Sequence, residues 1–301
     1  MSLVSYIQRP EVAARIKPFR PPPPRKINAS LKVEPRTDHW SLVGTAFDYF
    51  LRFELKRRAR HDVWKMEREG YTAEIMNLFS SYIVYPVLKE QVAACGWTEF
   101  EFTSTCDLIE QEARGVCSTF VGIPSPTSLQ LQTLAGHAIR LARLEPIRRA
   151  GRIDETIFDD PEPADIEDLM ELLAVVPFED LTHGTNLLLN PSFGESSSIV
   201  GGADVDLISG DRLIDFKTTK KGEMEVKYLD QIFGWFLLAR RERRLNSKFP
   251  EINKLGLYFC RHGHLWLREA SEWTSKPGFQ QLEEWFYDHA REVYSQRTGS
   301  I

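Results

Sequence analysis

The chain has 301 residues, of which 42% are hydrophobic and 27% are charged, and this composition is typical of a globular protein with a sizeable core. It has no run of about eighteen or more apolar residues and no signal-peptide pattern, so we expect a cytoplasmic protein without a membrane partner. Its four cysteines form no Cys-x-x-Cys pair and have no histidine at ligand spacing, which argues against zinc-finger and iron–sulfur proteins.

The net charge of -5 is unevenly distributed. Eleven Asp or Glu and no Lys or Arg lie between Asp154 and Asp180, so the rest of the chain carries a net charge of +6. Residues 52–60, 139–152 and 237–248 each contain five basic residues and one acidic residue. Such runs usually cover solvated helix faces, but three of them together are compatible with a polyanionic partner.

The first part of the chain is predicted to be mainly helical. Residues 1–38 include PFRPPPPRK, a polyproline-II segment, and are predicted to form a proline-rich N-terminal arm. Residues 41–60 place apolar side chains near a period of 3.6 and predict a helix with a basic far end. Residues 39–190 are therefore expected to form a helical region. Its further helices are predicted over residues 72–95, 129–149 and 165–176.

A β-hairpin is predicted after this region. The Gly, Ser and Pro residues of NPSFGESSS (190–198) precede two β-rich runs, over residues 199–208 and 212–219. Ser209-Gly210-Asp211 joins them and has the composition of a tight turn.

The elements after the hairpin complete an α/β core. An amphipathic helix is predicted over residues 226–245, a second strand pair over residues 254–270, and a last helix over residues 279–294. The order β-β-α-β-β predicts a sheet with helices packed on it. We expect residues 191–301 to contain this core.

The hairpin carries charges where apolar residues would be expected. Side chains alternate along a strand, so Asp204 and Asp206 share one face of the first strand, and Asp215 and Lys217 share one face of the second. A turn at Ser209-Gly210 would put Asp204 opposite Asp215, whereas a turn one residue later would put Asp206 there. Either register brings carboxylates together, so a compensating cation is required.

A divalent metal ion would supply this charge. Oxygen ligands from Asp204 or Asp206 and from Asp215, with the backbone carbonyl of Phe216 available between them, suit Mg²⁺ or Mn²⁺. Lys217 would lie beside the ion, where its ammonium holds and polarises the attacking water, or where burial lowers its pKa and makes it the base. Because such an ion acidifies water and neutralises charge on a phosphate oxygen, the pattern predicts phosphodiester hydrolysis.

An acid-x-Lys triplet alone is a weak signal, and this chain contains three, at residues 54–56, 215–217 and 225–227. Only the middle one lies in a predicted strand that follows further aspartates across a tight turn. Only that triplet is followed by a helix with a polar residue, Gln231, on its apolar side. Gln231 lies four residues before Trp235 and shares its helix face.

The hairpin and the following helix resemble the PD-(D/E)XK nuclease superfamily and, within it, the RecB-like branch. The resemblance is carried by GGADVDLISGDRLIDFKTTK (201–220) followed by QIFGW (231–235). The family pattern is Gly-x-x-Asp, a strand, (Asp/Glu)-x-Lys, and Gln-x-x-x-Tyr on the next helix. The resemblance implies a restriction-endonuclease-like core, which is a small mixed β-sheet flanked by helices. Residues 60–190 match nothing in that core and would be an insertion.

The resemblance also implies roles for individual residues. Asp204 and Asp215 would be metal ligands, Lys217 the catalytic lysine, and Gln231 the first residue of the helix motif. Asp206 is the alternative to Asp204 as the first metal ligand, since the family's aspartate is often followed directly by an apolar pair. The chain departs from the pattern at Trp235, which keeps the aromatic ring of the family's tyrosine and loses its hydroxyl group.

An upstream helix is similar to a second, looser family motif. VGTAFDYFLR (43–52) resembles Gly-Thr-x-x-His, with Asp48 at the position of the histidine. The resemblance implies that Asp48 is a further metal-site group. An acid in the first half of a helix is also commonly there for the helix dipole, and both interpretations stay open.

The resulting functional hypothesis is a Mg²⁺- or Mn²⁺-dependent nuclease that acts on nucleic acid, with DNA expected as the substrate. The alternative is a catalytically inactive nuclease-fold scaffold that binds nucleic acid or a protein partner, and no protein partner is indicated by the residues. Basic residues near the motif are predicted to contact phosphates. These are Arg52, Lys220, Lys221, Arg240 and Arg241.

Overall fold

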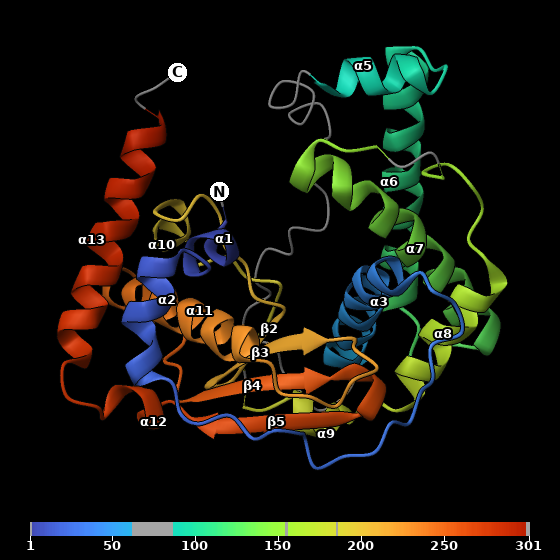
Figure 1. Ribbon diagram of the computed structural model, residues 1–301. Coiled ribbons are helices and arrows are strands. Elements are labelled where there is room, and N and C mark those ends of the chain that lie inside the picture. Colours follow the sequence, from blue (N-terminus) through green and yellow to red (C-terminus); the bar gives the residue numbers. More distant parts are fainter. Residues whose placement is uncertain (1, 62–86, 154–155, 185, 299–301) are drawn as a thin grey trace.

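The computed structural model describes residues 2–61, 87–153, 156–184 and 186–298 (Figure 1). These residues form an α/β fold, in which helices flank both sides of one mixed sheet. None of the helices within these ranges is long and apolar enough to cross a membrane.

Five strands form the sheet in the order β1-β2-β3-β4-β5. They are β1 (Leu187–Leu189), β2 (Leu207–Ser209), β3 (Arg212–Lys217), β4 (Lys254–Phe259) and β5 (His264–Glu269). Neighbouring strands are antiparallel, except that β3 and β4 are parallel and are joined by α11 (Val226–Leu245). A parallel pair needs such a crossover connection. The predicted order β-β-α-β-β is confirmed, and β1 begins the sheet before the predicted boundary at residue 191.

Each face of the sheet has its own hydrophobic core, because successive side chains on a strand point to opposite faces. Leu213 of β3 and Leu257 of β4 belong to the core that contains α11 and α13 (Phe279–Thr298). Their neighbours Ile214 and Tyr258 belong to the other core, which contains α3 (Trp40–His61) and α7 (Ser128–Ala150). The central strands are therefore buried on both faces.

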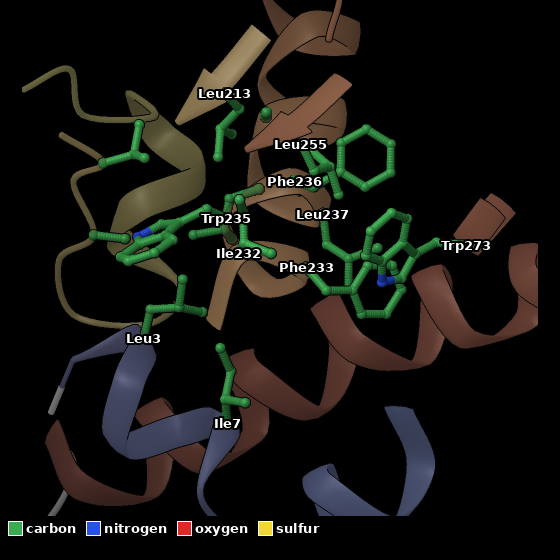
Figure 2. Close-up of a cluster of buried hydrophobic side chains, with 14 of the residues drawn as sticks. Leu3, Ile7, Leu213, Ile232, Phe233, Trp235, Phe236, Leu237, Leu255 and Trp273 are labelled. Carbon is green, nitrogen blue, oxygen red and sulfur yellow. The ribbon is translucent and has the colours of Figure 1, made fainter. Parts of the chain in front are cut away.

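The segment before the proline-rich stretch packs on this sheet and is not a free arm. It forms α1 (Leu3–Ile7), α2 (Pro10–Ile16) and a short 3₁₀ helix (Lys17–Phe19). Tyr6 is fully buried, and its hydroxyl donates to the Phe286 carbonyl at 3.0 Å. The prediction of an arm is corrected for these residues, because Leu3 and Ile7 of α1 dock against α11 (Figure 2), and α2 contacts α13.

The helical region agrees in part with the prediction. It contains α5 (Val87–Ala94), α6 (Glu99–Val121), α7, α8 (Pro163–Ala174) and α9 (Phe178–Leu181). The predicted helices at 129–149 and 165–176 correspond to α7 and α8, and most of the helix predicted at 72–95 lies outside the described residues. The sequence pattern missed α6, although Thr98 and Glu101 form a capping box at its start.

The first strand of the predicted hairpin is shorter than expected. The prediction covered residues 199–208, whereas β2 contains only Leu207–Ser209. Gly201 and Gly202 have φ angles of +73° and +111°, and the Ser197 hydroxyl donates to the Ala203 carbonyl, so the chain turns here after α10 (Glu195–Ser198). Asp204 keeps a single β-bridge, to Ser192. The short helix α12 (Ser271–Thr274) connects β5 to α13.

The docking of α1 on α11 can be tested at Gly234. A Cβ atom at this position would overlap Ile7 Cδ1 and would lie 3.3 Å from Leu3 Cδ1. We expect Gly234→Ala to lower the free energy of unfolding by about 1–2 kcal/mol, because overpacking outweighs the better helix propensity of alanine. Urea denaturation followed by circular dichroism measures this change.

Gly115 is the matched control, since it also lies inside a helix but has no atom within 4 Å of an added Cβ. Gly115→Ala should raise the free energy of unfolding by about 0.5–1 kcal/mol through propensity alone. Equal stabilisation by both substitutions would contradict the packing of α1 against Gly234.

Candidate functional site

The turn between β2 and β3 decides which aspartate faces Asp215. Leu207 pairs with Ile214, and Ser209 pairs with Arg212, so Gly210-Asp211 is the two-residue turn. Gly210 has a φ of +59°, a left-handed conformation that glycine adopts at little cost. Continuing this register by one residue places Asp206 opposite Asp215. The structure thus adopts the second of the two registers that the sequence allowed.

Asp206 and Asp215 converge at the end of β3. An oxygen of Asp206 accepts a hydrogen bond from the Phe216 N–H at 2.5 Å. Asp215 is 3% exposed, and its Oδ2 lies 2.5 Å from Lys217 Nζ in an ion pair. The site therefore contains a buried carboxylate whose charge is compensated by the ammonium of Lys217.

The side chain of Lys217 is held from the side of α11. Its ammonium donates to Gln231 Oε1 at 3.0 Å and lies 4.9 Å from the centre of the Tyr228 ring. Tyr228 and Gln231 are three residues apart and so lie on one face of α11. The structure thus brings together Lys217 and Gln231, two residues that the sequence motif singles out.

The electrostatic environment keeps Lys217 charged. Burial alone would lower the pKa of Lys217, but the carboxylate of Asp215 and, more weakly, those of Asp206 and Asp48 raise it above its ordinary value. The ammonium form of Lys217 is therefore favoured when no metal ion is bound beside it.

Helix α3 brings Asp48 to the same cluster. A Cβ atom on Gly44 would lie 3.7 Å from Thr218 Cβ, so α3 passes the end of β3 at this point. Asp48 follows one helical turn later. Its charge is close enough to raise the pKa of Asp206 and that of Lys217. This proximity agrees with the prediction that Asp48 belongs to the site, and its role as a ligand stays a prediction.

Asp206 is the most strongly perturbed carboxyl group of this cluster. Its pKa is raised well above the ordinary value, first by burial and then by the charges of Asp48 and Asp215. The Phe216 N–H and Lys217 oppose this rise only in part. We refer to Asp48, Asp206, Asp215 and Lys217 as the acidic cluster.

Asp204 takes part in a separate network beside the acidic cluster. The side-chain amide of Asn190 connects Asp204 to Arg52. In the orientation that satisfies both of its polar atoms, its nitrogen donates to Asp204 Oδ2 at 2.8 Å and its oxygen accepts from Arg52 Nη1 at 3.2 Å. The backbone of Asn190 has a φ of +47°, and its N–H donates to the Asp206 carbonyl at 2.9 Å. Of the two candidate first ligands, Asp206 is the one placed opposite Asp215.

The acidic cluster has the chemistry that a hard divalent cation requires. Three carboxylates share one lysine, so a second positive charge would relieve the repulsion that raises the pKa of Asp206. Their oxygen atoms are of the kind that Mg²⁺ and Mn²⁺ prefer, and the identity of the ion stays a prediction. The carbonyl of Phe216 as a further ligand stays a prediction. The sequence pattern did not indicate Asn190 or Tyr228, because neither belongs to a motif of charged residues.

A tighter set of ligand atoms occurs elsewhere in the described residues. Atoms of His39, Glu162 and Asp165 lie within 4.8 Å of one another. Within the same described ranges, the carboxylates of the acidic cluster do not gather this closely. The sequence pattern did not indicate the His39 set, because His39 lies more than a hundred residues before Glu162 and Asp165.

The predicted phosphate-contacting lysines lie at the surface just beyond β3. Lys220 and Lys221 are both exposed, and Lys220 forms an ion pair of 2.8 Å with Glu34. Both side chains of that pair are more than 60% exposed, so it contributes little to stability and can be exchanged for a phosphate.

The predicted arginines are engaged within the protein. Arg52 is 6% exposed, and its Nε donates to the Asp48 carbonyl at 3.0 Å. Arg240 pairs with Glu283 at 2.8 Å, and Arg241 donates to the Ser196 hydroxyl. As contacts to nucleic acid, these three residues stay predictions.

Comparisons of this chain with protein-family models, curated proteins and solved structures find no match. The chemistry of the site is therefore argued from its residues and their arrangement.

The raised pKa of Asp206 predicts a pH-dependent gain of stability in Asp206→Asn when no divalent ion is added. Because folding raises this pKa from about 3.8, the native state holds the proton more tightly than the unfolded chain. The contribution of the Asp206 carboxyl group to the free energy of unfolding therefore falls as pH rises above about 4, by about 1.4 kcal/mol for each pKa unit. The asparagine variant should lack this decline, which urea denaturation at several pH values in chelator would show.

Asp288→Asn is the control, because Asp288 is exposed and paired with Arg291 on the surface. It should keep the pH profile of the wild type. Parallel profiles for Asp206→Asn and the wild type would contradict the electrostatic account of the cluster.

Proposed function

We propose that this chain is a divalent-metal-dependent nuclease that hydrolyses phosphodiester bonds in DNA. The observation that carries the proposal is the meeting of Asp206, Asp215, Lys217 and Gln231 at the end of β3. These residues include the acid-x-Lys triplet and the helix glutamine that the resemblance to the PD-(D/E)XK superfamily singles out. The mixed sheet flanked by helices supports the restriction-endonuclease-like core that the resemblance implies.

The proposed division of labour follows from the contacts. Asp206 and Asp215 would hold the ion, with Asp48 beside them. When bound, Mg²⁺ or Mn²⁺ supplies Lewis acidity and neutralises negative charge on the phosphate. Lys217 would donate a hydrogen bond to the attacking water or to a phosphate oxygen, since an ammonium group has three donors and Gln231 and Asp215 engage two of them.

The surroundings of Lys217 favour an enzyme over an inactive scaffold. Packed hydrophobic residues often stabilise a protein as well as a buried ion pair does, or better. A scaffold would therefore gain no stability from burying Asp215 or from placing Asp206 close to other carboxylates. A site that must bind a cation and a phosphate requires both of these carboxylates.

Removal of Lys217 tests the mechanism. We expect Lys217→Ala to reduce Mg²⁺-dependent DNA cleavage by at least about 100-fold, because the variant loses the positioned proton donor. Cleavage of linear, circular and single-stranded DNA would be followed on gels with Mg²⁺, Mn²⁺ or chelator, and circular dichroism would establish folding.

Lys227→Ala is the matched control, since Lys227 ends another acid-x-Lys triplet but is 60% exposed and pairs with Glu225 at the start of α11. It should cleave as the wild type does. DNA binding without cleavage by the wild type under every metal condition would instead support the scaffold, and undiminished cleavage by Lys217→Ala would remove the proposed role of this lysine.

A further inference from the structure

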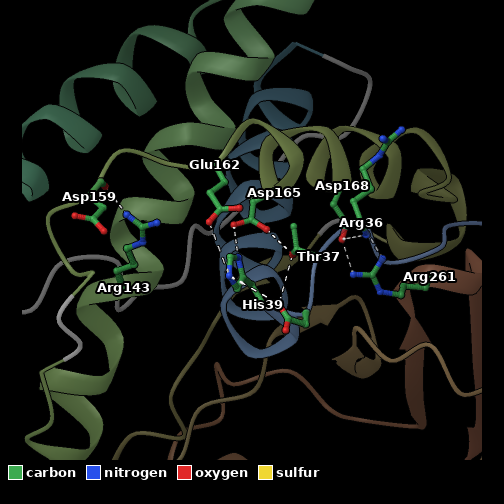
Figure 3. Close-up of polar contacts among 10 residues, drawn as sticks. Arg36, Thr37, His39, Arg143, Asp159, Glu162, Asp165, Asp168 and Arg261 are labelled. Carbon is green, nitrogen blue, oxygen red and sulfur yellow. Dashed lines mark hydrogen bonds and ion pairs between the residues drawn. The ribbon is translucent and has the colours of Figure 1, made fainter.

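The His39 set lies at the start of two helices, on a cavity that Asp48 of the acidic cluster also lines. His39 immediately precedes α3, Glu162 immediately precedes α8, and Asp165 lies in the first turn of α8 (Figure 3). Asp38 is next to His39 in the chain and contributes a further carboxylate, with its Oδ1 4.0 Å from His39 Nε2. These four residues bring one imidazole and three carboxylates together.

Asp165 fixes the orientation of the imidazole ring. Its side chain is fully buried, and one oxygen lies 3.0 Å from His39 Nδ1. The other oxygen accepts a hydrogen bond from the Thr37 hydroxyl at 2.6 Å. An ionised Asp165 therefore accepts the proton on Nδ1, which leaves Nε2 as the ligand atom of a neutral ring. Histidines that bind metal ions are commonly held by a carboxylate in this way.

The opposite edge of the ring faces two exposed carboxylates. Glu162 Oε1 and Asp38 Oδ1 each lie 4.0 Å from His39 Nε2. Ligand atoms on one tetrahedral ion lie about 3.4 Å apart, because the bonds are about 2.1 Å long. Glu162 is 56% exposed and Asp38 is 91% exposed, so both side chains can rotate to close the difference.

The surroundings attract a cation. The set opens onto a cavity of about 810 Å³, whose acidic lining includes Asp159, Asp160 and Glu145. Arg143 also lines the cavity, but it is buried and donates to the Asp159 carbonyl. The starts of α3 and α8 each add a positive end of about half a charge, which the three carboxylates of the set outweigh.

We propose that His39, Glu162 and Asp38 bind a divalent transition-metal ion such as Zn²⁺, with Asp165 as the residue that orients His39. One imidazole nitrogen and two carboxylates suit an ion of this class better than Mg²⁺, which prefers oxygen ligands alone. This site is distinct from the acidic cluster, and its occupation does not depend on nuclease activity. The rival explanation is an ion pair of a protonated His39, since the hydrogen bond that His39 donates to Asp165 raises the pKa of this histidine.

Zn²⁺ titration of the full chain by calorimetry tests the proposal. We expect His39→Gln and Glu162→Gln each to remove one bound Zn²⁺ per chain or to weaken it at least tenfold. Asp165→Asn should weaken the same ion by about 10- to 100-fold, as expected for a residue that orients a ligand. Glu162 is at the surface, so its variant keeps the test valid even if the substitution of buried Asp165 impairs folding.

Two controls separate this site from other Zn²⁺ binding. His183→Gln removes a half-exposed histidine that lies 3.9 Å from Asp211, and it should keep the affinity and stoichiometry of the wild type. Asp206→Asn alters the acidic cluster and should leave the His39-dependent ion in place, whatever its effect on DNA cleavage. Equal Zn²⁺ affinity and stoichiometry in the wild type, His39→Gln and His183→Gln would overturn the proposal and leave a simple ion pair.

Discussion

Charge compensation at the end of β3 constrains the rest of the core. The register of the hairpin places Asp206 opposite Asp215, and α3 adds Asp48, whereas Lys217 is the one cation among these four side chains. Repulsion between like charges grows as water is excluded, so the lysine must be held accurately to be effective. The parallel pairing of β3 with β4 secures this, because its crossover helix α11 returns over the same face and presents Gln231 to the ammonium.

The sequence predicted the helices and strands of this core, but it left the register of the β2–β3 hairpin open. The bounds of α11 and the place of the hairpin follow from local periodicity and turn residues. The choice between Asp204 and Asp206 depends on a slip of one residue, which normally moves apolar side chains from a core to solvent. Here β2 and β3 are apolar on both faces, and Leu213 and Ile214 enter different cores, so alternation could not exclude either register.

The remaining features depend on contacts between distant parts of the chain. Asn190 joins the site because its left-handed backbone and its amide connect β1 to Asp204 and Asp206. Nothing in the local sequence distinguishes it from an ordinary turn residue before a proline. The segment before the proline-rich stretch was likewise predicted as an arm, since its short helices gain their stability from burial against α11 and little from their own length.

The distribution of positive charge shows a further difference between sequence and structure. The basic runs suggested surfaces that bind phosphates, yet Arg57 and Arg58 pair with buried Glu54, and Arg240 and Arg244 pair with buried Glu283. These ion pairs neutralise much of the positive charge of the basic runs. The cavity that Asp48 lines carries six carboxylates and one arginine. For the proposed nuclease, phosphates would therefore be drawn to the site by bound cations and by the exposed lysines after β3. Binding of metal ions and binding of substrate would then be coupled through the same carboxylates.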